Sequence, residues 1–217
     1  MAGHRRKDVM TTQDDDRNTV DVFSSSLREH GQSFRALNWG SEEGQANRFR
    51  ILCEIGLSDG DSVLDVGCGL GDLYGHLQHS GVSASYTGLD ITPDMISTAR
   101  QRFPDAAFRE GSLLGTLEPP LPQVDYVLAS GIFYLRRERP FEHLQASVRR
   151  MFDLCRKGVA FNCLSSWGDA AGGSDEYRES PVKCLEFCRT VSPWAVLRHD
   201  YHPGDFTIYL RREAMRL

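Results

Sequence analysis

Residues 62–72 have the sequence SVLDVGCGLGD, in which a short apolar run ends in three glycines at alternate positions. Apolar runs of this length are typical of buried strands, and closely spaced glycines mark a tight turn. Such a turn brings the backbone amides at the start of the following helix close to a ligand, which is the general anchor of nucleoside and dinucleotide sites. We therefore expect a strand, a binding loop and a helix that runs from Asp72 to about His79.

Strands and helices continue to alternate on both sides of this loop. Before it, residues 41–56 have the apolar spacing of a helix, with Ser41 as its cap. After it, a strand is predicted at 86–90, and Thr92-Pro93 opens a helix because proline is favoured in the first helical turn. The next predicted strands are 107–109, 124–129 and 159–163. The helix before the last of them has an apolar face of Phe141, Leu144, Val148, Met151 and Phe152.

This alternation predicts an α/β fold, because parallel strands need long crossovers that place helices on both faces of the sheet. The C-terminal part breaks the pattern. The apolar runs 195–197 and 206–210 have no helix between them, so they should form an antiparallel hairpin at one edge of the parallel sheet.

Two carboxylates are predicted to flank the glycine loop. Asp65 lies in the strand before the loop and Asp90 ends the next strand. A carboxylate at the first position would face the negative charge of a pyrophosphate, and Asp72 stands where the dinucleotide fingerprint has its third glycine. S-adenosylmethionine carries an ammonium group and a sulfonium but no phosphate, and Asp90 can accept from both hydroxyls of a ribose. The two acids therefore favour S-adenosylmethionine over NAD or FAD.

Several segments resemble the class I, Rossmann-like S-adenosylmethionine-dependent methyltransferases, in particular their small bacterial members. Residues 63–72 resemble the glycine-loop motif of this family, and residues 86–95 (YTGLDITPDM) resemble its ribose-binding segment. Residues 108–114 (FREGSLL) occupy the place of the adenine-binding segment, with Ser112 where the family often has an acid that accepts from the adenine amino group; the Ser112 hydroxyl or the backbone could take that contact here. Residues 125–133 (DYVLASGIF) resemble the fourth strand and the loop beside the methyl-transfer site. The resemblance covers about residues 35–212 and implies a three-layer sandwich around a seven-stranded, mostly parallel sheet with the antiparallel C-terminal hairpin.

The resemblance implies S-adenosyl-L-methionine as the cofactor and assigns residues to it. The segment 37–49 is similar to a lid, in which Trp39 and Gln45 would cover the cofactor and Arg48 would pair with its carboxylate. The alternative for Arg48 is an exposed residue of an ordinary amphipathic helix. The predicted cofactor-binding residues are Trp39, Arg48, Asp65, Gly67, Cys68, Gly69, Asp72, Asp90, Ile91, Met95, Gly111, Ser112 and Ser130.

The methyl acceptor should lie at the carboxyl ends of the strands, where open α/β sheets bind ligands. The candidate acceptor-binding residues are Phe133, Tyr134, Arg136, Asn162, Trp167, Tyr177 and Tyr201. Tyr134 and His202 are the candidate catalytic residues, although His202 precedes Pro203-Gly204 and can equally be a turn residue. Arg136, Arg137 and Arg139 form a charge run that we interpret as solvated. We expect no metal, because methyl transfer from a sulfonium mainly requires positioning and exclusion of water.

Composition limits the kind of acceptor. The chain has 217 residues, a net charge of -5 and a pI near 5.8, which gives no general attraction to nucleic acid. Residues 130–133 (SGIF) also lack the Asn/Asp-Pro-Pro-aromatic loop of the enzymes that methylate DNA adenine or glutamine side chains. A small metabolite methylated at O, N or S is therefore the leading hypothesis. A protein or RNA methyltransferase and a non-catalytic S-adenosylmethionine-binding regulator remain as alternatives.

The sequence also predicts the organisation of the chain and its setting. Residues 1–20 are polar and lack apolar periodicity, so we expect a flexible arm, followed by one methyltransferase domain at 21–217 with a helical lid at 21–57. The six cysteines form no CxxC pair, and no apolar run is long enough to span a bilayer. We expect free thiols, no membrane or nucleic-acid partner, a monomer or homodimer, and a cytoplasmic protein.

Overall fold

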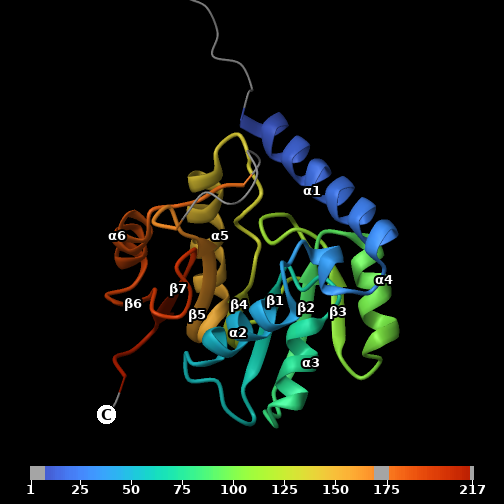
Figure 1. Cartoon of the computed structure of the whole chain (residues 1–217). Coiled ribbons are helices and arrows are strands. Elements are labelled where there is room, and N and C mark those ends of the chain that lie inside the picture. Colours follow the sequence, from blue (N-terminus) through green and yellow to red (C-terminus); the bar gives the residue numbers. More distant parts are fainter. Residues whose placement is uncertain (1–7, 169–175, 216–217) are drawn as a thin grey trace, which may run out of the picture.

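Seven strands form one sheet in the computed structural model of the chain, which describes residues 8–168 and 176–215 (Figure 1). The strands are β1 Ser62–Val66, β2 Ser85–Asp90, β3 Ala107–Glu110, β4 Val124–Ala129, β5 Cys155–Leu164, β6 Trp194–Arg198 and β7 Asp205–Arg211. The helices are α1 Asp8–His30, α2 Glu42–Cys53, α3 Asp72–His79, α4 Pro93–Arg102, α5 Pro140–Leu154 and α6 Pro181–Val191, with a short 3-10 helix, η1, at Phe34–Leu37.

The strand order is β3-β2-β1-β4-β5-β7-β6. The first five strands are parallel, and β7 pairs antiparallel with both β5 and β6. This arrangement confirms the predicted mostly parallel sheet with an antiparallel C-terminal pair. It also places β7 inside the sheet, so that its first residue, Asp205, pairs with Leu164 at the carboxyl end of β5.

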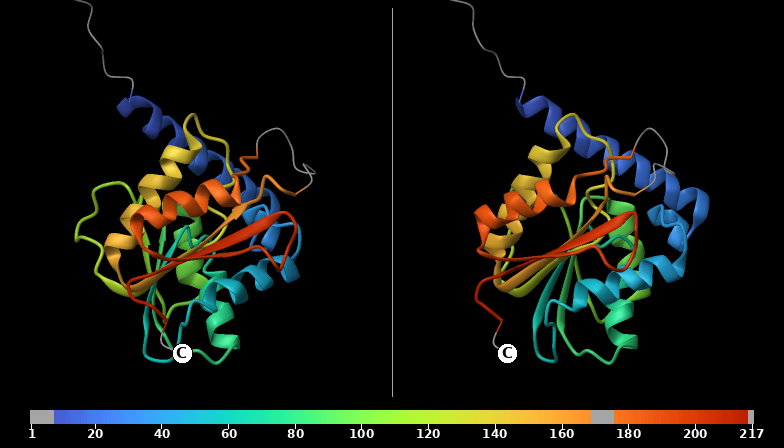
Figure 2. Two further views of the ribbon diagram at one scale, coloured as in Figure 1. Left: turned by 90° about the vertical axis from the view of Figure 1, so that its left-hand side faces the viewer. Right: turned by 60° about the vertical axis from the view of Figure 1, so that its left-hand side comes forward.

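Helices cover both faces of the sheet, as the alternating pattern predicts (Figure 2). Successive side chains of β1 point to opposite faces. Leu64 packs into a core cluster with the apolar face of α5, including Leu144 and Val148, whereas Val63 packs with residues of α2, α3 and α4 such as Phe49 and Ile96. The two clusters hold the sheet between its helical layers and fix the strand ends that surround the site.

The N-terminal segment differs from the expected flexible arm over residues 8–20, which lie in α1. Phe23 and Leu27 pack against a small buried cluster that includes Leu70 and Met95. Contacts of this kind with distant parts of the chain offset the entropy of ordering a polar helix. The helix crosses above the carboxyl ends of the parallel strands (Figure 1).

Two further expectations concern the thiols and the membrane. All six cysteines are free, which confirms the prediction of free thiols, and five of them are buried. Among the helices of residues 8–168 and 176–215, none combines the length and the apolar character needed to cross a membrane.

Gly158 in β5 provides a test of this strand packing. A Cβ atom there would lie 2.7 Å from the carbonyl oxygen of Leu210 and 3.0 Å from Cδ1 of Ile55. Since the carbonyl belongs to a paired strand and cannot move freely, we expect Gly158→Ala to lower the free energy of unfolding by about 1–3 kcal/mol in urea denaturation.

The matched control is Gly40→Ala, because no atom lies within 4 Å of a Cβ built there. This change should alter stability by less than about 1 kcal/mol. Equal stability of the two variants would contradict the close packing of β5 against β7.

Candidate functional site

The glycine loop lies between the carboxyl end of β1 and the first turn of α3. Gly67 and Gly69 have φ angles of 71° and 52°, in the left-handed region that favours glycine. The amides of Gly67 and Cys68 donate to the carbonyl of Leu89, at distances of 2.7 and 3.1 Å. The loop is thereby fixed against β2 and leaves a hollow at the strand ends.

Asp65 is a buried carboxylate beneath this loop. Its side chain accepts a hydrogen bond from the hydroxyl of Tyr86 at 2.6 Å and is 3% exposed. Burial raises the pKa of Asp65 to about 7, although the Tyr86 hydrogen bond acts in the opposite direction. A cationic ligand group at this position would favour the ionised carboxylate.

Asp90 faces the loop from the end of β2. One carboxylate oxygen accepts from the amide of Gly69 at 2.9 Å, and the other accepts from the amide of Thr92 at 2.8 Å. Burial raises the pKa of Asp90, and these amide hydrogen bonds oppose that effect. They fix the orientation of a carboxylate that still has accepting capacity for ligand hydroxyls.

Asp72 differs from these two acids because the protein already supplies its counterion. It pairs with Arg102 at 2.7 Å and accepts from the side chain of Gln45 at 3.1 Å. These contacts join α2, α3 and α4 beside the loop. Gln45, expected to cover the cofactor, instead positions Asp72.

A cavity with a volume of about 130 Å³ lies above the loop. Every predicted cofactor-binding residue except Arg48 contributes to its wall. Ile91, Met95 and Leu113 give it apolar surfaces, and Asp65 and Asp90 give it acidic ones. These apolar and acidic side chains fit a flat base, a ribose and an ammonium group, and they do not fit a pyrophosphate.

The wall of this cavity also includes residues that sequence reasoning missed: Asp16, Thr19, Phe23, Ile132, Leu135, Arg137, His143 and Ser147. Arg137 corrects the interpretation of a solvated charge run, because its side chain is 10% exposed and pairs with Asp16 at 3.2 Å. Burial and the charge of Arg137 lower the pKa of His143 to about 4. The spacing of Thr19, Phe23 and Leu27 along one helical face is the signal that could have revealed α1.

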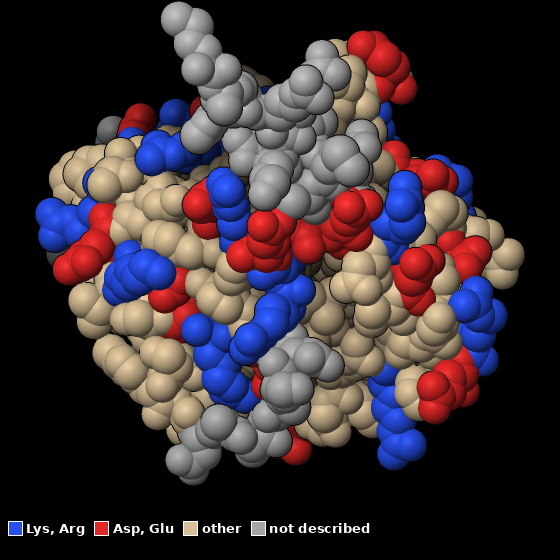
Figure 3. All heavy atoms as spheres, turned by 90° about the horizontal axis from the view of Figure 1, so that it is seen from above, with Lys and Arg blue, Asp and Glu red and all other residues tan. Residues whose placement is uncertain are grey.

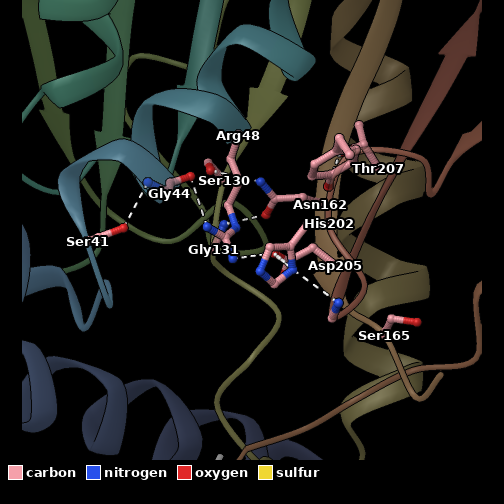
Figure 4. Close-up of polar contacts among 12 residues, drawn as sticks. Ser41, Gly44, Arg48, Ser130, Gly131, Asn162, Ser165, His202, Asp205 and Thr207 are labelled. Carbon is pink, nitrogen blue, oxygen red and sulfur yellow. Dashed lines mark hydrogen bonds and ion pairs between the residues drawn. The ribbon is translucent and has the colours of Figure 1, made fainter. Parts of the chain in front are cut away.

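A second cavity of about 170 Å³ adjoins the first, and Leu37, Trp39 and Gly131 line both. Of the candidate acceptor-binding residues, Phe133, Tyr134 and Asn162 line this second cavity. Asn162 accepts from the amide of Gly131 at 2.8 Å and donates to the hydroxyl of Ser130 at 2.9 Å (Figure 4). It therefore holds the loop after β4, which lies at the boundary of the two cavities.

Arg48 lies in the wall of the second cavity and has partners within the protein. It forms an ion pair with the buried carboxylate of Asp205 and donates to the carbonyl of Gly44 (Figure 4). Its guanidinium carbon also lies 4.9 Å from the centre of the Trp39 ring. This placement differs from the expected role at the cofactor carboxylate. It connects the start of α2 to the first residue of β7.

The other candidates lie outside both cavities. Arg136 is exposed, and Trp167 is 59% exposed and packs against His199. Tyr177 donates to Glu179, and the hydroxyl of Tyr201 is 2.8 Å from that of Thr207. His202 is exposed, lies 3.0 Å from Asp205 and accepts from the amide of Gly204, which fits its alternative as a turn residue (Figure 4).

Fold and site together define a Rossmann-like protein that binds a nucleoside ligand. A family model described as a methyltransferase domain matches residues 63–158. The chain is also 32% identical over 166 residues to Rv1506c of Mycobacterium tuberculosis, a protein named as a candidate methyltransferase, with coverage of 74% of this chain and 98% of that protein. The chain therefore belongs to the class I S-adenosylmethionine-dependent methyltransferases.

Other similar proteins share parts of the sequence or only the fold. Trans-aconitate 2-methyltransferase of Escherichia coli is 31% identical over 90 residues, which cover 42% of this chain and 35% of that enzyme. The magnesium protoporphyrin IX methyltransferase of Synechocystis, solved with bound S-adenosylmethionine, aligns over 98% of this chain and 100% of its own with a TM-score of 0.66 at 14% identity. The complex of DhpI with S-adenosylhomocysteine aligns over 93% of this chain and 98% of its own with a TM-score of 0.66 at 21% identity.

The pKa of Asp65 gives a testable pH dependence of cofactor binding. In the free protein this pKa is raised to about 7, and an adjacent ligand ammonium would lower it, so binding below that pH must release a proton. We expect the affinity for S-adenosylhomocysteine to increase from about pH 5.5 to pH 8, with proton release measured by calorimetry in buffers of different ionisation enthalpy.

Asp65→Asn is the control, because an amide oxygen can still accept from Tyr86 but cannot titrate in this range. The variant should lose both the proton release and most of the pH dependence. Equal affinity at both pH values in the native protein, without proton release, would contradict this role of Asp65.

Proposed function

We propose that this methyltransferase transfers a methyl group to an O, N or S atom of a small molecule bound in the second cavity. The observation that carries this proposal is the contact between the two cavities. They share Trp39 and Gly131 as lining residues, so ligands bound in the two cavities would lie next to each other at this boundary. Methyl transfer requires this proximity, because the nucleophile must approach the methyl group in line with the bond that breaks.

The first cavity would hold the cofactor by complementary charge and shape. Asp90 would accept from the ribose hydroxyls, Asp65 would face the ammonium group, and Ile91 and Met95 would pack against the base. S-adenosylmethionine supplies a methyl group that is already activated by the positive sulfur. The protein therefore needs to position the acceptor and exclude water more than to provide strong acid or base catalysis.

The second cavity would orient the acceptor through a few polar groups on an aromatic wall. Phe133 and Trp39 provide flat apolar surfaces, and Asn162 holds the loop at Gly131 in place. The hydroxyl of Tyr134 accepts from the side chain of Asn38 at 2.7 Å, and burial raises the pKa of Tyr134. Tyr134 would thus remain protonated at neutral pH and act as a hydrogen-bond donor to the acceptor rather than as a base.

Surface charge and the similar proteins both support a small acceptor. On the coloured part of the face above the strand ends, basic and acidic side chains are interspersed (Figure 3). Such a surface lacks the continuous basic area that usually binds a phosphate backbone. The names of two similar enzymes, trans-aconitate 2-methyltransferase and magnesium protoporphyrin IX methyltransferase, also indicate small-molecule acceptors for those proteins.

The proposal is tested by following S-adenosylhomocysteine formation with a panel of small carboxylic acids, phenols, amines and thiols. We expect turnover with members of one class. Asp90→Ala should remove the ribose contacts, lower the affinity for S-adenosylhomocysteine by about 100-fold in calorimetry and reduce turnover at limiting cofactor.

Asp94→Ala is the matched control, because Asp94 is exposed in the first turn of α4, close to Asp90 in sequence. It should bind S-adenosylhomocysteine as the native protein does. Turnover confined to proteins or RNA would contradict the small-molecule acceptor, and unchanged binding by Asp90→Ala would contradict the placement of the cofactor.

A further inference from the structure

The segment after β3 lacks an acid at the position that would face the base of the cofactor. Ser112 stands there and lines the first cavity together with Gly111 and Leu113. Adenine presents an exocyclic amino group, which is a hydrogen-bond donor that benefits from an anionic acceptor. A serine hydroxyl is a weaker acceptor than a carboxylate, so a carboxylate from elsewhere in the chain would match this donor better.

Helix α1 brings a carboxylate to this place from 96 positions earlier in the chain. One carboxylate oxygen of Asp16 lies 3.4 Å from the hydroxyl of Ser112, and Asp16 itself lines the first cavity. The contact with Ser112 is long for a hydrogen bond between a hydroxyl and a carboxylate, so a better donor can replace it. A ligand amino group between Asp16 and Ser112 would be such a donor.

Neighbouring groups hold the Asp16 carboxylate in position. Arg137 pairs with the second carboxylate oxygen of Asp16 at 3.2 Å and also donates to the hydroxyl of Thr19 at 3.1 Å, one helical turn further along α1. His143 lines the same part of the cavity, and its low pKa leaves it uncharged at neutral pH. The oxygen near Ser112 has no basic partner among the ion pairs of the described residues.

We propose that Asp16 accepts a hydrogen bond from the exocyclic amino group of the adenine, so that α1 supplies the acid that the segment at Ser112 lacks. This inference rests on the proposed placement of the cofactor in the first cavity. It makes Asp16 a determinant of specificity for adenine over bases that carry an oxygen at the same position. It also gives α1 a direct role in closing the cofactor site.

The test compares two ligands in calorimetry with the full chain: S-adenosylhomocysteine and S-inosylhomocysteine, in which a carbonyl oxygen replaces the amino group. The native protein should bind the adenosyl ligand at least about tenfold more tightly, because the carbonyl oxygen would face a carboxylate. In Asp16→Asn the amide can donate to that carbonyl, so the ratio of the two affinities should fall to about one or below. A general effect of the substitution on the fold would lower both affinities by the same factor and leave their ratio unchanged.

Two control variants separate recognition from support of the helix. Asp14→Asn changes an exposed acid on the same helix and should keep the native ratio. Arg137→Gln removes the ion pair with Asp16 and should lower the affinities for both ligands by the same factor, so the ratio stays as in the native protein. If Asp16 had only a structural role, Arg137→Gln and Asp16→Asn would change the ratio in the same way. If Asp16→Asn fails to fold, Asp16→Ala is measured in the same way and should also lose the preference.

The outcomes distinguish this inference from the proposed function. A native ratio retained in Asp16→Asn, with normal binding of S-adenosylhomocysteine, would overturn the role of Asp16 and leave the cofactor site intact. A native protein that binds neither ligand would overturn the cofactor placement itself, and the role of Asp16 with it.

Discussion

Two desolvated carboxylates at the ends of neighbouring strands are the constraint on which this site depends. Asp65 and Asp90 face the glycine loop, and their hydrogen bonds come from a hydroxyl and from backbone amides. Neither takes part in the ion pairs found among residues 8–168 and 176–215, whereas the adjacent Asp72 has Arg102. Burying acids without cations costs free energy, as the raised pKa values of both show. A ligand that brings an ammonium group and ribose hydroxyls offsets this cost, and a ligand that brings phosphates increases it. Because the protein gives Asp65 and Asp90 no cationic partner, the site favours a ligand with positive charge and no phosphates.

The parts of the fold that follow local rules could be predicted from the sequence. The strand at 62–66, the helix at 72–79 and the strand at 124–129 have the predicted bounds, because apolar runs, glycine turns and helix periodicity are properties of adjacent residues. The part of the first cavity's wall that the glycine loop and Asp90 form was also predictable, since both follow directly from two strand ends. Ser41 accepts from the amide of Gly44, as expected of a helix cap.

What could not be predicted depends on contacts between distant segments. Residues 8–18 have no apolar core pattern of their own, so only the spacing from Thr19 to Leu27 indicates α1 in the sequence. The partners that hold this helix, at Arg137 and in the cluster around Leu70, are distant in the sequence. Arg48 has the charge to bind a carboxylate, but its partner is Asp205, which β7 brings beside β5 only when the sheet is complete. The second cavity is likewise lined by segments that are distant in the sequence, so the tertiary fold decides which candidate residues reach it. Hence Phe133, Tyr134 and Asn162 line it, whereas Trp167, Tyr177 and Tyr201 do not.

The most direct test of the central claim is a calorimetric comparison of S-adenosylmethionine, NAD⁺ and ATP as ligands of the same protein sample at neutral pH. The two acids that flank the glycine loop predict a saturable binding heat for S-adenosylmethionine. An excess of NAD⁺ or ATP should not displace the bound S-adenosylmethionine. Binding of NAD⁺ or ATP with equal or higher affinity, in competition with S-adenosylmethionine, would contradict the selection of the cofactor by Asp65 and Asp90.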